Sequence, residues 1–137
     1  MKEIVIYSDG ASSGNPGLSG VGIVIYKNGA LLKKISHFIG KTTNNVAEYS
    51  AFIQALQEVR SLNPEKLELK TDSELLYKQL KGDYKVKHAN IKPLFIQIKL
   101  MLSHFKQVDI SHIGREDNAL ADKLAKEAIK KAKREQV

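Results

Sequence analysis

The chain has 137 residues, 42% hydrophobic and 27% charged, a composition that excludes a disordered chain or a coiled coil and predicts a single domain spanning residues 1–137. It contains no cysteine, which excludes disulfides and thiolate metal sites, and no apolar run approaches the roughly 20 residues that cross a bilayer, so we expect a cytoplasmic location without a membrane partner. The net charge of +7 suits a polyanionic partner, although it could equally serve solubility alone.

The first part of the chain has the pattern of an antiparallel meander. Residues 2–8 are rich in Ile and Val and too short for a helix, which favours a strand. Turn-forming residues from Gly10 to Gly20 separate this strand from a second one over residues 21–26. The Asn28-Gly29 pair predicts a two-residue hairpin turn, after which residues 31–39 form the returning strand.

Helical and strand patterns alternate in the rest of the chain. Residues 44–60 show helical spacing and lead to a short strand over 67–71, so a parallel crossover is expected. The remaining predicted elements are a helix over 73–80 capped by Ser73, a helix over 90–104, a strand over 107–113 and a basic helix from residue 118 onward. The pattern predicts an α/β fold, with a mixed five-stranded sheet of three antiparallel strands followed by parallel strands, and helices packed on it.

Four acidic residues occupy related places in these elements. Asp9 follows the first strand and Asp72 follows the 67–71 strand, and ligands gather outside the carboxyl ends of such strands. Glu48 lies at the margin of an apolar helix stripe, and Asp122 lies near the start of the last helix. Each acid alone has an ordinary explanation as a turn or helix-start residue. Carboxylates about 4 Å apart repel by about 4 kcal/mol at an effective dielectric constant of 20, so a cluster persists only with bound cations or raised pKa values. A hard divalent cation such as Mg²⁺ is the expected answer.

Four stretches of the chain resemble the type 1 ribonuclease H family. They are YSDGASSGNPGLSGVG, TTNNVAEYSAFIQAL, LKTDSELLYKQL and HIGREDNALADKLA, in the order of the family and over nearly the whole chain. The resemblance implies a single RNase H-like domain in which Asp9, Glu48, Asp72 and Asp122 bind two Mg²⁺ or Mn²⁺ ions. It further implies hydrolysis of the RNA strand of RNA–DNA hybrids, which leaves 3′-hydroxyl and 5′-phosphate ends.

The resemblance also implies contacts with the hybrid from Asn15, Asn44 and Asn45. An amide can both donate to and accept from a 2′-hydroxyl, which is the group that distinguishes RNA from DNA. Helix capping is the alternative role for Asn44. The other candidate substrate-binding residues are Gly10, Ser12, Ser73, Lys85 and Lys87. The basic residues of the last helix, including Lys126, are expected to form a solvated face.

The group that assists the acids is expected to be Arg115. Many members of the family carry a mobile histidine before the last acid, but His112 falls within a predicted strand, whereas Arg115 lies in the following loop. We therefore expect Arg115 to contact the scissile phosphate or to help the product leave. Other functions remain open: cleavage of double-stranded RNA, strand transfer as in related transposase folds, and a non-catalytic hybrid-binding module. The presence of all four acids disfavours the last of these. We expect a monomer.

Overall fold

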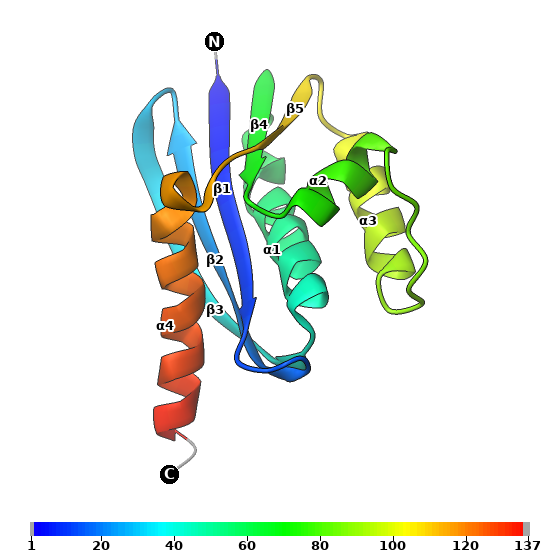
Figure 1. Ribbon diagram of the computed structural model, residues 1–137. Coiled ribbons are helices and arrows are strands. Elements are labelled where there is room, and N and C mark those ends of the chain that lie inside the picture. Colours follow the sequence, from blue (N-terminus) through cyan, green and yellow to red (C-terminus); the bar gives the residue numbers. More distant parts are fainter. Residues whose placement is uncertain (1, 136–137) are drawn as a thin grey trace.

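The computed structural model describes residues 2–135 and contains one five-stranded sheet with helices on both faces (Figure 1). The strand order is β3-β2-β1-β4-β5, with antiparallel pairing among the first three strands and parallel pairing of β4 to β1 and of β5 to β4. The strands are β1 (Glu3–Ser12), β2 (Gly17–Lys27), β3 (Ala30–Thr42), β4 (Lys66–Thr71) and β5 (Val108–His112). The predicted mixed sheet is confirmed.

The helices also follow the predicted order. They are α1 (Asn44–Val59), α2 (Glu74–Lys81), α3 (Lys92–Leu102) and α4 (Ala119–Glu135), with 3₁₀ turns η1 (Arg60–Leu62) and η2 (Arg115–Asn118). Ser73 caps α2 as predicted, since its hydroxyl accepts from the Leu76 amide at 3.2 Å. The cap of α1 is Thr43, which accepts from Val46, so Asn44 is the first helical residue and not the cap.

The main core lies between one face of the sheet and α1, with α3 packed beside α1 (Figure 1). Ile4, Ile6 and Leu69 from the strands meet Phe52 and Leu56 of α1, and all five side chains are buried. Aliphatic burial on this scale, at about 25 cal/mol per Å², is the main stabilising contribution. It fixes α1 against β1, and hence the place of Glu48.

The glycine-rich segment departs from the sequence prediction. Residues 10–20 were expected to form a turn cluster, but β1 runs on to Ser12 and β2 begins at Gly17, so Asp9 lies inside a strand and not at its end. Gly20 and Gly22 serve helix packing: a Cβ at Gly22 would overlap the backbone of Ala121, and one at Gly20 would overlap that of Ala125. The two glycines therefore let α4 lie directly on β2.

The buried face of α4 consists of small side chains that fit this close approach. They are Ala121, Ala125, Ala128 and Ala132, together with Ile129. Helix α4 thus covers the face of the sheet opposite α1 and carries Asp122 to it (Figure 1). Among residues 2–135, no helix combines the length and the apolar character needed to cross a membrane.

Candidate active site

Asp9 and Asp72 lie side by side because their strands pair in parallel. The last pair of the β1–β4 ladder joins Ser8 to Thr71, and the two acids are the next residues of the two chains. β1 continues beyond this point paired with β2, whereas β4 ends. Asp9 is therefore held by a strand partner on one side and faces the open end of β4 on the other.

Glu48 reaches the same place from α1. The Gly10 amide donates to Glu48 Oε2 at 3.2 Å. A Cβ on Gly10 would overlap the backbone of Ala47 and Glu48, so glycine is required for α1 to approach β1 this closely. Gly10 is itself buried, and its direct effect in the structure is to position Glu48.

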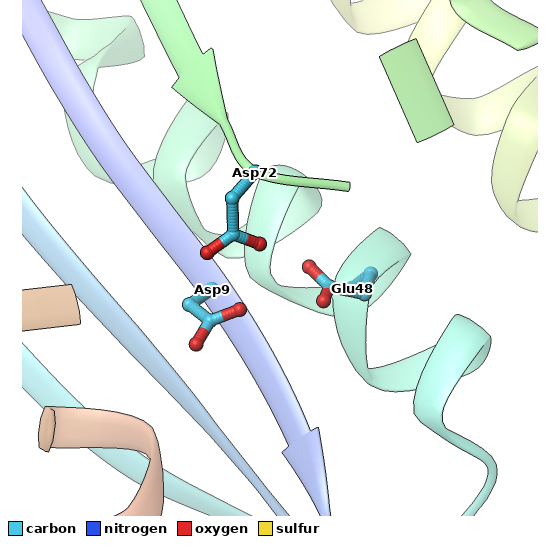
Figure 2. Close-up of side chains that lie close together, drawn as sticks. All are labelled: Asp9, Glu48 and Asp72. Atoms are coloured by element: carbon cyan, nitrogen blue, oxygen red, sulfur yellow. The ribbon is translucent and has the colours of Figure 1, made fainter. Parts of the chain in front are cut away.

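Three carboxylates converge at this point. Asp9, Glu48 and Asp72 each offer an oxygen, and these oxygens lie within 4.8 Å of one another (Figure 2). Asp9 is 5% and Glu48 7% exposed, so both charges are largely withdrawn from water. Figure 2 shows the three side chains pointing towards one another from β1, α1 and the end of β4.

Asp122 completes the group from the opposite face of the sheet. Asp9 is paired with Gly22, which faces α4, and Asp122 in the first turn of α4 lines the same cavity as the other three acids. The cavity measures about 360 Å³. The four acids named from the sequence are thus brought together, three in a tight cluster and the fourth beside it.

The electrostatics of the cluster favour either protonation of its acids or a bound cation. Burial, then the charges of Glu48 and Asp72, raises the pKa of Asp9, and burial followed by the charge of Asp72 raises the pKa of Glu48. For Asp122, burial opposes ionisation, but the neighbouring Lys126 ammonium and other groups outweigh it and lower its pKa. The donors are all carboxylate oxygens, which hard divalent ions such as Mg²⁺ or Mn²⁺ prefer, so the residues fit such an ion.

Arg115 and His112 occupy different places. Arg115 lies in η2, lines the acid cavity, and its charge acts to lower the pKa of both Glu48 and Asp122. His112 is the last residue of β5 and is exposed; its Nε2 lies 3.3 Å from the Asp72 carbonyl oxygen, and its ring stacks on Tyr77 with centroids 5.8 Å apart. The cavity therefore contains the guanidinium and not the imidazole.

The candidate substrate-binding residues separate into three groups. Ser12 and Asn44 line the acid cavity, and the Asn15 side chain accepts from the Asn44 amide at 3.2 Å, which ties the β1–β2 turn to the start of α1. Asn45 follows in the first turn of α1, and Ser73 is engaged as the α2 cap. The lysines 85 and 87 lie in the exposed segment between α2 and α3, away from the acids.

Two residues of the site were not identified from the sequence. Asn118 is 1% exposed and donates to Asp72 Oδ2 at 3.2 Å and to the Ser8 carbonyl at 2.9 Å. Lys126 is 61% exposed, in keeping with the expected solvated face, but it also lines the acid cavity and its Nζ lies 3.0 Å from Asp122 Oδ2. Both stand four residues from Asp122, and this i±4 spacing, which places side chains on one helix face, is the signal that could have revealed them.

The chain is similar to known proteins over most of its length. A family model described as "Reverse transcriptase-like" matches residues 7–128. A ribonuclease H of Prosthecochloris aestuarii is 37% identical over 145 aligned residues, which cover 94% of this chain and 97% of the relative. The bifunctional protein Rv2228c of Mycobacterium tuberculosis is 35% identical over 129 residues; the match covers 93% of this chain but only 35% of that protein.

Solved structures agree with these matches. The structure of LC11-RNase H1 in complex with an RNA/DNA hybrid superposes with a TM-score of 0.89 at 42% identity, covering 94% of this chain and 98% of that one. The fold, the extent of the match and the identity agree. The chain belongs to the type 1 ribonuclease H family.

Proposed function

We propose that this chain is a divalent-metal-dependent endoribonuclease that hydrolyses the RNA strand of RNA–DNA hybrids and leaves 3′-hydroxyl and 5′-phosphate ends. The observation that carries the proposal is the convergence of Asp9, Glu48 and Asp72 within 4.8 Å, with Asp122 in the same cavity. The hybrid-bound structure of LC11-RNase H1, at 42% identity, supports the choice of substrate.

The four acids are proposed to hold two Mg²⁺ or Mn²⁺ ions when substrate is bound. Two divalent ions supply positive charge to both the attacking and the leaving side of a phosphodiester during hydrolysis. The protein contributes the rigid placement of the ligands: β1 and β4 fix two acids through their ladder, and buried contacts of α1 and α4 fix the others. Arg115 is proposed to contact the scissile phosphate.

Selection of RNA is assigned to the start of α1 and the β1–β2 turn. Asn15, Asn44 and Asn45 are proposed to contact the minor groove and its 2′-hydroxyls, with Ser12 beside them in the cavity. Gly10, which lines the cavity, and Ser73, the residue after Asp72, are proposed as further substrate contacts. Lys85 and Lys87 are proposed to meet phosphates of the hybrid, so affinity should fall as salt rises.

We also propose that residues 1–137 form one RNase H-like domain that acts as a monomer. All five strands belong to one sheet, and one buried cluster joins it to α1 and α3. The large apolar side chains exposed in the described part of the chain are dispersed over β3, the segment after α2, α3 and α4. Their spread over four segments supports the absence of one large contiguous apolar interface in the described part of the chain.

A cleavage assay on matched RNA/DNA, RNA/RNA and DNA/DNA duplexes, with Mg²⁺ and with EDTA, tests the function. We expect cleavage of the RNA strand of the hybrid with Mg²⁺ and none with EDTA. Asp72→Asn should abolish cleavage, whereas Asp83→Asn, on the exposed loop after α2, should not. Metal-independent cleavage, or none with any metal, would overturn the proposal, and preferential cleavage of RNA/RNA would change the substrate.

A further inference from the structure

Lys126 lies one helical turn after Asp122, on the same face of α4, and is directed into the acid cavity. Its Nζ is 3.0 Å from Asp122 Oδ2, and the two side chains are 61% and 39% exposed. A second lysine–acid pair with the same i,i+4 spacing, Lys123 with Glu127, lies 4.0 Å apart on the same helix, and neither residue lines that cavity. The helix therefore contains a pair inside the site and a comparable pair outside it.

The positively charged side chains of the cavity do not pair equally with the four acids. Among the described residues, the cavity lining contains two positive side chains, Arg115 and Lys126. Lys126 forms an ion pair with Asp122 at 3.0 Å. In residues 2–135 no ion pair within 4.0 Å is found for Asp9, Glu48 or Asp72. The acids of the tight cluster have no direct cationic partner, whereas Asp122 already has one.

We propose that Lys126 competes with a divalent cation for the Asp122 carboxylate. The inference rests on the proposed function, because it concerns the metal that the acids would hold. A carboxylate oxygen at 3.0 Å from an ammonium cannot present the same lone pair to a metal ion, so the ion must displace Lys126 or bind beside it against its charge. The lysine stem is flexible and half in solvent, so displacement requires only a rotamer change.

This competition acts on one part of the site. An ion held by Asp9, Glu48 and Asp72 meets no lysine, whereas an ion that also needs Asp122 must overcome the Lys126 charge. Lys126 therefore weakens the metal position next to Asp122 and leaves the position at the three-acid cluster much less affected. The two positions should fill at different metal concentrations for this reason.

The test measures Mn²⁺ binding to the full chain without nucleic acid, by calorimetry and by electron paramagnetic resonance of free Mn²⁺. Lys126→Met removes the charge and keeps most of the stem, Lys126→Arg keeps the charge, and Lys123→Met is the matched control outside the cavity. We expect Lys126→Met to tighten the weaker Mn²⁺ site by about two- to fivefold, the size expected for a partly exposed ion pair. The other two variants should match the wild type.

The inference is overturned if Lys126→Met binds Mn²⁺ with unchanged or weaker affinity. If the same variant leaves Mn²⁺ binding unchanged but raises the KM for the hybrid, Lys126 contacts substrate and does not compete with metal. If the wild type cleaves hybrids with metal but Lys126→Met binds Mn²⁺ no more tightly than the wild type, only this inference fails and the proposed function stands. A wild type that binds no Mn²⁺ and cleaves nothing would defeat the proposed function as well. Circular dichroism of each variant confirms folding.

Discussion

Asn118 Nδ2 lies 3.2 Å from Asp72 Oδ2 and 2.9 Å from the carbonyl oxygen of Ser8, so one side chain joins the start of α4 to both strands that carry the central acids. The Ser8 carbonyl and the Asp72 carboxylate are both acceptors, so the Asn118 side chain must turn its NH₂ group towards them. The amide oxygen is buried, and no hydrogen-bond partner for it is found within residues 2–135. A buried unsatisfied oxygen is costly, so the arrangement must be held by the two donated bonds and the surrounding packing.

Replacing Asn118 with Ala should lower both stability and turnover. The substitution leaves the Ser8 carbonyl unsatisfied and frees the Asp72 carboxylate to rotate, and we expect about 1–3 kcal/mol less unfolding free energy in urea. We also expect kcat to fall by about tenfold or more, because Asp72, the proposed metal ligand, is no longer fixed. Asn90→Ala, at an exposed position between α2 and α3, is the matched control and should change neither. Full turnover in Asn118→Ala would refute the positioning role.

The raised pKa values of Asp9 and Glu48 predict a pH dependence of stability in the absence of metal. Both groups keep their protons when folded at pH values where the unfolded chain, with ordinary values of 3.8 and 4.5, has lost them. Folding therefore takes up protons, and the stabilisation present at low pH is lost as pH rises from about 4 through the raised pKa values. Asp122, whose pKa is lowered, contributes in the opposite sense, but only at pH below its ordinary value of 3.8.

Thermal unfolding in EDTA should thus show a midpoint that falls between about pH 5 and pH 8. Glu48→Gln, which cannot ionise, should show a shallower fall, and the difference between the two curves isolates this carboxyl from the other titrating groups. Added Mg²⁺ should stabilise the wild type most at the higher pH, because the ion binds the ionised acids. A wild-type midpoint that rises across this range in EDTA would contradict the raised pKa values.

The sequence predicted the parts of this molecule whose signals are local. Aliphatic runs gave the strands, and Asn28 and Gly29 have the positive φ angles, 49° and 84°, that the predicted hairpin turn requires. Asp9 and Asp72 could be predicted to lie together because their two strands are parallel neighbours and carry them at the same end of the sheet. What could not be predicted depends on contacts distant in sequence: Gly20 resembles a turn residue until α4 is known to pack on it.

The same limit explains why Asn118 and Lys126 were missed. Asn118 bonds to a carbonyl 110 positions away, which no local pattern records. Lys126 belongs to a helix rich in lysine, so its neighbours in the sequence do not distinguish it from the other lysines of α4. Its place beside the acids becomes visible only when α4 is packed on the sheet. Residues that act through tertiary contacts are therefore the ones that require the structure.

Gly10→Ala tests whether the distance between β1 and α1 controls the site. The added Cβ would overlap the backbone of Ala47 and Glu48, so α1 must move away and carry Glu48 with it. We expect a loss of about 1–3 kcal/mol in unfolding free energy, as in overpacked cores, and at least a tenfold loss of turnover. At Gly29 a Cβ would meet no other atom, but the residue has a positive φ angle, so Gly29→Ala should lower the free energy of unfolding through backbone strain. The turnover of the folded protein should stay unchanged. Equal turnover losses in both would show that instability, not displacement, is responsible.

The placement of Arg115 and His112 predicts unequal effects of their removal. Arg115 faces the four acids and is the cavity cation without an ion pair among the described residues, which leaves its guanidinium available to a phosphate oxygen. His112 is occupied by the Asp72 carbonyl and by stacking on Tyr77. Arg115→Ala should therefore lower kcat by about one to two orders of magnitude, within the range for loss of one charge-stabilising donor.

His112→Ala should change kcat by less than about threefold, because the ring lies outside the cavity and packs on Tyr77. Single-turnover kinetics on one hybrid, combined with Mn²⁺ affinity for each variant, separate the two roles: Arg115→Ala should keep its metal affinity within a few fold while losing the chemical step. If His112→Ala loses turnover and Arg115→Ala retains it, the imidazole must swing from Tyr77 into the site during the reaction. The assisting group would then be the histidine, reached by a motion of the β5–η2 connection.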